Sequence, residues 1–186
     1  MGLTEIQEQF VHLALDSSFR ERLFSQNPTE ENLFNSLEAE IAITARSLIS
    51  KRMGIVANQL PLTRKLLGDE FGRKFREYAQ IGKEPQGVNR HRLDSIRFAR
   101  HLVREIRAGK LPRPLGTLLV HETSPLHMWM KRKRFVIRFC RYDPGALQQL
   151  VRTTGSVDGV SGCLTFVIWR ECRSGQGYRW STFPVG

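Results

Sequence analysis

The side chains best suited to metal binding or nucleophilic catalysis are five histidines and three cysteines, and their spacing matches no motif for either chemistry. No two histidines lie four residues apart, and His121-Glu122 lacks the second histidine that a helical zinc site needs. Three cysteines without a CxxC pair argue against a disulfide framework, so we expect free thiols on strands. The sequence therefore predicts no metal site; the side chains considered are His12, His91, His101, His121, His127, Cys140, Cys163 and Cys172.

Three closely spaced glycines are the part of the sequence most similar to a phosphate-binding loop. Gly155, Gly159 and Gly162 follow a predicted helix and precede a predicted strand, which reverses the order found in nucleotide-binding folds. We interpret them as loop residues. The sequence also lacks the GxSxG, P-loop and dinucleotide-binding motifs. A stand-alone enzyme would need convergent ionisable groups, which the sequence does not assemble, so we expect no catalytic residues in this chain.

Charge is distributed unevenly along the 186 residues, whose formal net charge is +11. Residues 1–40 carry two basic and eight acidic side chains, residues 41–110 carry sixteen and six, and residues 111–186 carry eleven and four. A basic surface of this kind suits nucleic acid or an anionic protein face. Because no nucleic-acid-binding motif is present, we expect a protein partner. A basic DNA-binding regulatory module stays open as the alternative, with the predicted helix Leu93 to Lys110 as its candidate recognition helix.

The sequence shows no signal for membrane insertion or secretion. No apolar stretch approaches eighteen residues, and the first sixteen residues contain no Lys or Arg and no apolar run of signal-peptide length. An apolar content of 40% over this length is enough for a hydrophobic core. We therefore expect a soluble, cytoplasmic protein of one or two domains that makes no contact with a membrane.

Apolar residues at helical spacing predict an all-helical domain over residues 1–110. Its centre is a helical hinge at which Pro61 begins a short helix, Gly68 ends it, and Phe71, Phe75 and Tyr78 share one face of the next helix. A surface loop then leads to a strongly amphipathic basic helix that ends near Gly109. Further helices are expected from Thr4 to Asp16, from Ser17 or Ser18 to Asn27, and from Thr29 to Gln59 with a possible second cap at Ser36.

The hinge also carries a family resemblance. The stretch LPLTRKLLGDEFGRKFREYA, followed by a Pro-containing loop and RLDSIRFARHLVREI, resembles the helical domain of the accessory partners of iron-dependent TIM-barrel enzymes that modify peptides. The segments FVHLALDSSFRERLF and LPRPLGTLLVHETSPLHMW are similar to the same family. The remaining segment, from KRKRFVIRFCRYD through CLTFVIWRE to YRWSTFPV, looks most like the methanobactin-biosynthesis branch, whose second domain is rich in strands.

This resemblance implies a function that the residues alone do not. It implies a heterodimer with an iron-dependent TIM-barrel enzyme that uses oxygen to oxidise cysteines of a ribosomally made precursor peptide. In the methanobactin branch the products are oxazolone and thioamide groups that later bind copper. The iron would then be held by the partner enzyme, and this chain would bind no cofactor of its own.

After Leu111-Pro112-Arg113-Pro114 the periodicity changes from that of helices to that of strands, which predicts a β-sheet domain over residues 111–186. We expect a brief helix over 115–120, strands over 134–142, 163–171 and 178–185, and one further helix from Pro144 to the closing Gly155. A hairpin turn over Ser174 to Gly177 should pair the last two strands antiparallel. Together the two halves predict an α+β protein with a small antiparallel or mixed sheet.

The first of these strands is the candidate site for the leader of the precursor peptide. A sheet of three strands is too small to close into a barrel, so its edge strands keep unpaired backbone groups that can accept an extended peptide as an additional strand. The first strand begins after a basic run and has a long link to the next strand, so we expect it at an edge. The candidate residues are Phe135, Val136, Ile137, Arg138, Phe139, Cys140 and Arg141.

The basic run from Lys131 to Arg134 has two interpretations. Charges at the start of a strand deter unwanted edge pairing. Alternatively, these charges and the neighbouring aromatic and thioether side chains form a protein interface, because such side chains are enriched at interface centres. The candidate interface residues are His121, His127, Trp129, Lys131 and Arg132.

Overall fold

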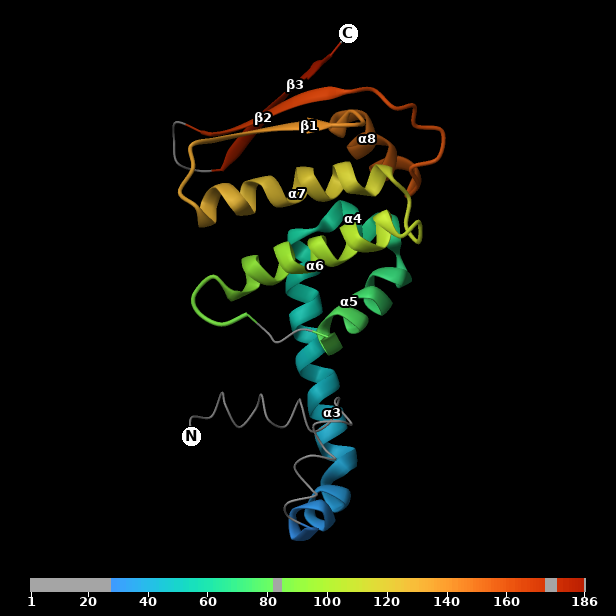
Figure 1. The fold of residues 1–186 in the computed structure, drawn as a ribbon, viewed down its shortest axis with the longest axis vertical. Helices are drawn as coiled ribbons and strands as arrows, with labels where there is room; N and C mark the ends of the chain where they lie inside the picture. Colours follow the sequence, from blue (N-terminus) through green and yellow to red (C-terminus); the bar gives the residue numbers. More distant parts are fainter. Residues whose placement is uncertain (1–27, 82–84, 173–176, 186) are drawn as a thin grey trace.

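The computed structural model describes residues 28–81, 85–172 and 177–185, and for residues 28–42 it describes the course of the backbone only. The helices predicted between Thr4 and Asn27 and the turn residues 173–176 lie outside the described residues. Helix α3 runs without a break from Pro28 to Gln59, so a second cap at Ser36 is not needed. One end of α3 projects away from the rest of the fold (Figure 1).

Three shorter helices pack around the other end of α3: α4 (Pro61–Leu67), α5 (Asp69–Ile81) and α6 (Arg90–Arg107). Pro61 is at the start of α4, where its missing N–H costs nothing. Gly68 ends α4 at φ 53°, a conformation that favours glycine. This abrupt stop allows α5 to turn back, so the hinge predicted from the sequence is confirmed.

The core of the helical part is aromatic. Phe71, Phe75 and Tyr78 of α5 are buried and surround Phe98 of α6, with ring centroids 5.1 to 5.5 Å from that of Phe98. Phe71 and Phe75 meet Phe98 edge to face, an arrangement worth about 0.5–1.5 kcal/mol per pair beyond the buried area. The shared face predicted for these residues is therefore confirmed as core.

Helix α7 extends from Pro114 to Met130, so the predicted helix over 115–120 is too short. The pattern was misleading because Pro125 lies inside the helix, where proline usually ends or kinks it. The hydroxyls of Thr123 and Ser124 donate to the carbonyls of Leu119 and Val120 one turn earlier, which keeps these polar side chains compatible with a helix. The first helix of the C-terminal part of the chain is therefore a long element instead of a brief one.

The sheet contains three antiparallel strands in the order β1 (Phe135–Cys140), β2 (Thr165–Glu171) and β3 (Tyr178–Pro184). Helix α8 (Pro144–Thr154) connects β1 to β2. The Asp143 carboxylate caps it by accepting from the backbone N–H groups of Gly145 and Ala146, and Gly155 ends it at φ 72°. The fold is α+β, as predicted.

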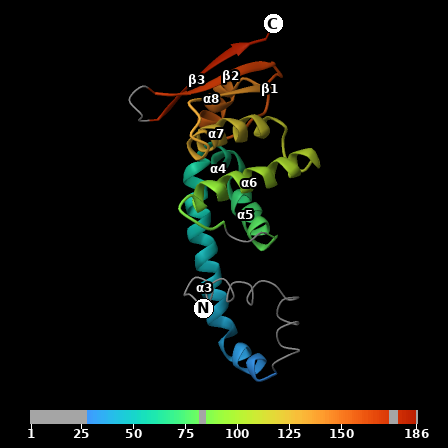
Figure 2. The same cartoon turned by 60° about the vertical axis from the view of Figure 1, so that its left-hand side comes forward.

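The elements form successive layers, with α7 between the sheet and the helical part (Figure 1; Figure 2 from another side). One face of α7 packs beneath the sheet, where Met128 meets Val136, Val167 and Trp169. The other face packs against α4 and α6. Helix α7 begins just beyond residue 110, where the sequence predicts a domain boundary. It contacts α4 and α6 before that boundary and α8 and β1 after it. The division into two domains stays a prediction.

A buried carboxylate joins α7 to the hinge. Glu122 accepts from the backbone N–H of Leu62 at 2.6 Å, the backbone N–H of Thr63 at 3.2 Å and the Thr63 hydroxyl at 2.6 Å. Helix α4 has no cap from its own flanking side chain, so Glu122 satisfies N–H groups that the first turn leaves free. Burial raises the pKa of Glu122 to about 7, against the opposing effect of these three donors.

Candidate functional site

Strand β1 lies at one edge of the sheet, with β2 as its only hydrogen-bonded neighbour among the described strands. The Glu171 N–H donates to the Arg134 carbonyl at 2.8 Å, and these two residues are opposite each other just before the ladder begins. Because antiparallel pairs alternate between hydrogen-bonded and non-hydrogen-bonded, the backbone groups of Phe135, Ile137 and Phe139 point away from β2. These three residues therefore present their N–H and C=O groups to the free edge.

The two faces of β1 differ sharply in exposure. On the inner face, Val136 and Cys140 are 6% and 3% exposed and pack with Met128 of α7. Burial raises the pKa of the Cys140 thiol to about 11, so this cysteine is a packing residue at neutral pH. On the outer face, Phe135 and Phe139 are 62% and 70% exposed.

The outer face of the sheet carries an apolar row although it faces solvent. Phe139, Phe166 and Phe183 lie side by side across the three strands, with centroids 5.5 and 6.1 Å apart. No described element covers this face (Figure 1 and Figure 2). An antiparallel sheet with one solvated face normally alternates apolar with polar residues. An uncovered row of this kind is typical of an interaction surface.

The opposite edge, on β3, is less suited to strand pairing. The Val185 N–H donates to the Leu164 carbonyl at 2.9 Å and the Cys172 N–H to the Gly177 carbonyl at 3.0 Å. These two bonds show which residue pairs of β2 and β3 are hydrogen-bonded and which are not. The nitrogen of Pro184 then points to the free edge, where it has no hydrogen to donate. Strand β1 has no proline and keeps its three free-edge donors.

The basic run begins at the end of α7 with an unusual backbone conformation. Arg132 has a φ of 49°, and among the described residues it is the only one besides glycines with a positive φ. Its N–H donates to the Trp129 carbonyl at 3.3 Å and the Lys133 N–H to the Met128 carbonyl at 2.9 Å, which is the Schellman pattern. Glycine is the usual residue at this position, so an arginine here costs about 1–2 kcal/mol of conformational energy.

A cavity of about 440 Å³ adjoins this turn and is lined by residues from α7, β2, β3 and the loop before α6. Its walls include Trp129, Arg132 and Tyr178, and the Oδ1 atom of Asn89 is buried without a hydrogen-bond partner among the described residues. Trp129 is 45% exposed, and the guanidinium of Arg92 lies 3.6 Å from the centroid of its ring. The thioether and aromatic group predicted near the basic run is thus partly accessible.

His127 lies in a strongly basic environment. Burial lowers its pKa, and the positive charges of Arg100, Lys131 and Arg138 lower it further. These three cations come from α6, the end of α7 and β1, so separate elements bring positive charge to one place. The guanidinium of Arg138 also donates to the Ile137 carbonyl at 3.0 Å, which is one of the carbonyls at the free edge.

The predicted interface residues do not form one patch. His127, Trp129, Lys131 and Arg132 lie within the last turns of α7 and the turn after it. His121 instead packs against Trp169 and Trp180, with ring centroids 5.8 and 4.8 Å away, and burial lowers its pKa. Its role in an interface stays a prediction, as do those of the other four residues.

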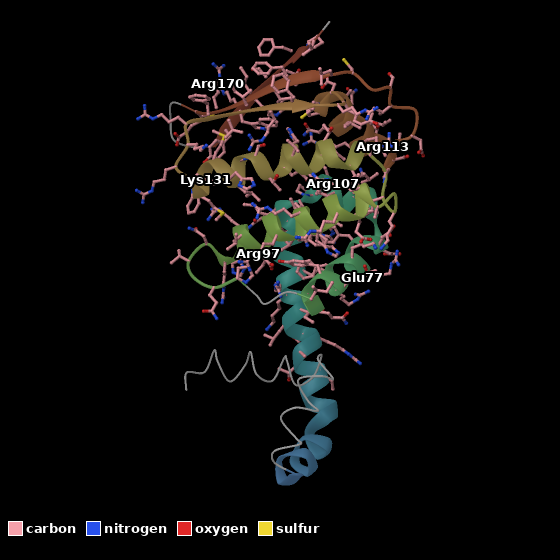
Figure 3. All side chains as sticks on the ribbon, viewed as in Figure 1. Glu77, Arg97, Arg107, Arg113, Lys131 and Arg170 are labelled. Atoms are coloured by element: carbon pink, nitrogen blue, oxygen red, sulfur yellow. The ribbon has the colours of Figure 1, made fainter. Side chains whose placement is uncertain are left out.

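Helix α6 carries a row of arginines along its solvent side. Arg90, Arg97, Arg100, Arg104 and Arg107 are exposed, and none of them forms an ion pair with the described residues. Figure 3 shows Arg97 and Arg107 of this row on α6 and Lys131 at the end of α7. Helix α6 packs against α3, α5 and α7, and its exposed residues before Ala108 are the five arginines of this row.

Two ionisable clusters could not be predicted from the sequence. The Asp94 carboxylate, on α6, accepts from the Arg52 guanidinium at 2.5 and 2.7 Å and from the Tyr78 hydroxyl at 2.7 Å. Burial and this carboxylate raise the pKa of Tyr78. Lys74 pairs with Glu105 at 2.7 Å and Glu77 at 3.1 Å. Both clusters fix α5 against α6, and a contact between residues 42 positions apart, such as Arg52 with Asp94, leaves no local signal in the sequence.

Within the ranges that the structure describes, no group of three His, Cys, Asp or Glu side chains could hold a metal ion. No helix in those ranges is both long and apolar enough to cross a membrane.

The comparisons with known proteins concern mainly the helical part. Residues 37–104 match the family model described as SCO6045-like, C-terminal domain. The match runs from within α3 through α4 and α5 into α6, and it ends before α7 and the sheet. No curated protein and no solved structure matches the chain.

Proposed function

We propose that this chain is a non-catalytic partner subunit of an iron-dependent oxidase complex, similar to the methanobactin biosynthesis subunit MbnC. In this role it binds a ribosomally made precursor peptide (MbnA-like) and presents the cysteines of that peptide to an iron-dependent TIM-barrel enzyme (MbnB-like). That enzyme converts them to oxazolone and thioamide groups. The iron is held by the partner enzyme, and this chain supplies binding and orientation.

The observation that carries the proposal is the free edge of β1. Three residues of this strand direct their backbone donors and acceptors away from the sheet, and the competing edge on β3 has a proline at a free-edge position. An extended peptide that pairs with β1 gains main-chain hydrogen bonds without a strict requirement on its sequence. Tethering the peptide raises the effective concentration of its cysteines at the iron of the partner.

The exposed apolar row on the outer face of the sheet adds support. An added strand would extend this face, and its own side chains would contact Phe135, Ile137 and Phe139 across the pair. Burial of these side chains contributes about 25 cal/mol for each Å² removed from water. The backbone edge and the apolar face would therefore act together on one peptide.

The proposal is tested by co-expression with an iron-dependent TIM-barrel enzyme, followed by size exclusion and iron analysis. We expect a heterodimer that contains iron, whereas this chain purified alone should contain none. Stoichiometric iron in the isolated chain, or a failure of the two proteins to associate, would contradict the proposal.

The arginine row of α6 favours one alternative, a basic DNA-binding module. Such a module would bind duplex DNA with an affinity that falls steeply with salt, since each neutralised phosphate releases counterions. Replacing Arg97 and Arg104 by Glu should then abolish DNA binding. Weak binding that is independent of DNA sequence and vanishes at physiological salt would exclude a regulatory DNA-binding role.

A further inference from the structure

A strand added to β1 would have two faces, and the two faces would meet different chemistry. Side chains of adjacent strands that lie on the same face come within about 4.5–5.5 Å of each other. On the outer side the neighbours are Phe135, Ile137 and Phe139, all of them exposed in the structure. Every second residue of the added strand would therefore face an apolar surface.

The intervening residues would face a basic surface, which we call the basic shelf: the cations Arg138, Lys131 and Arg100 around the side chain of His127. Arg138 is opposite Val167 in the strand register and so belongs to the inner face, but unlike Val136 and Cys140 it is exposed. His127 and Lys131 come from the end of α7 and Arg100 from α6. No acidic side chain among the described residues pairs with Arg100, Lys131 or Arg138.

Arg138 connects the shelf to the edge itself. Its guanidinium donates to the Ile137 carbonyl at 3.0 Å, and this carbonyl points to the free edge. A strand that pairs with β1 would donate a backbone N–H to the same carbonyl and so release the guanidinium. The released guanidinium is then free to donate to the added strand, where a carboxylate would be the strongest acceptor.

We propose that the segment that pairs with β1 alternates apolar or aromatic residues with acidic residues. The apolar residues cover the outer face. The acidic residues face the basic shelf and accept hydrogen bonds from the Arg138 guanidinium. This inference rests on the proposed function, because it specifies which peptide the β1 edge selects.

The competing explanation is that the shelf only protects the edge. Positive side chains on an edge strand keep other chains from pairing with it, and they do so whatever the pattern of the approaching peptide. Under that explanation no pattern of charges in a peptide would be favoured, whereas selection by the shelf makes the sign and the spacing of the charges decisive.

The test uses the full chain and three labelled synthetic peptides of equal length. The first alternates Glu with Val and Phe, the second has the same composition with its Glu residues in one block, and the third alternates Lys with Val and Phe. Affinity is measured by fluorescence anisotropy, and hydrogen exchange of the amides of Phe135 to Cys140 reports whether β1 is the strand that pairs.

We expect the alternating Glu peptide to bind about tenfold more tightly than either of the others, because two or more exposed charge contacts of about 0.2–1 kcal/mol each would act together. It should also slow the exchange of the β1 amides. In the Arg138→Glu variant the preference should reverse in favour of the Lys peptide. The control variant Arg113→Glu makes the same change of charge at the opposite end of α7 and should keep the original preference (Figure 3).

The outcomes separate this inference from the proposed function. If β1 is protected equally by all three peptides, the pattern is refuted and strand addition stands. If no peptide protects β1, strand addition itself is overturned, and the inference falls with it. If the Glu peptide is preferred but Arg138→Glu does not change the preference, the acidic residues bind elsewhere and the assignment to the shelf is wrong.

Discussion

Glu122 should make the stability of the protein depend on pH. Burial raises the pKa of this carboxyl from its ordinary value of 4.5 to about 7, although three donors contact it. Because the pKa in the folded state lies above that in the unfolded state, the folded state holds the proton more tightly. The contribution to stability is complete below about pH 4.5 and is lost as pH rises through about 7.

The size of this effect follows from the two pKa values. Each pKa unit corresponds to about 1.36 kcal/mol, so the full loss is about 3 kcal/mol, of which about 2–3 kcal/mol falls between roughly pH 5 and pH 8. The Glu122→Gln variant cannot ionise but keeps the shape of the side chain. The free energy of unfolding of this variant, minus that of the parent, should therefore increase by about 2–3 kcal/mol over the same range of pH.

Denaturant unfolding at a series of pH values measures this difference, and other titrating groups cancel because both proteins contain them. Glu171→Gln is the matched control, since it makes the same chemical change at an exposed residue. A flat difference for Glu122→Gln would refute the reasoning. It would mean that the N–H groups of Leu62 and Thr63 and the Thr63 hydroxyl outweigh burial and hold the carboxylate ionised.

Two further predictions concern the core and the end of α7. Phe75→Ala should lower the free energy of unfolding by about 3–5 kcal/mol, because Phe75 is fully buried against Phe98 and Tyr78; a loss of partner binding with unchanged melting would show that it is an interface residue instead. Arg132→Gly should raise stability by roughly 1 kcal/mol by removing a side chain from a residue with φ 49°, and it should weaken heterodimer formation if Arg132 belongs to the interface. Calorimetry would measure the stability of both variants, and size exclusion would measure heterodimer formation. A lower melting temperature for Arg132→Gly would show that the arginine side chain makes stabilising contacts of its own.

Local periodicity was sufficient to predict the elements in the described part of the chain except the extent of α7. The strands begin and end within two residues of their expected positions, and the face shared by Phe71, Phe75 and Tyr78 is buried as expected. Pro61, Gly68, Pro144 and Gly155 mark helix ends for backbone reasons that do not depend on the rest of the fold. Local signals of this kind are strongest where propensity and tertiary structure agree.

The features that the sequence did not predict depend on tertiary contacts. Helix α7 continues through Pro125 because it is packed between the sheet and the helical part, and packing of this kind overrides local propensity. Glu122 lies 60 positions from Leu62, and nothing in the sequence near either residue indicates that they meet. The basic shelf likewise combines residues of α6, α7 and β1, whose approach is visible only in the folded protein.

The central claim, that a peptide adds as a strand to the free edge of β1, is tested most directly by a proline at that edge. Ile137→Pro removes an N–H that points away from β2, so it should leave the β1–β2 ladder intact and weaken binding of the precursor peptide. Thr182→Pro is the matched control, because its N–H points to the free edge of β3. Thermal melting confirms that each variant is folded. We predict that peptide affinity falls by up to about tenfold in the Ile137→Pro heterodimer and is unchanged in the Thr182→Pro heterodimer, because the lost main-chain hydrogen bond is worth about 0.5–1.5 kcal/mol. Undiminished affinity in a folded Ile137→Pro complex would contradict the claim.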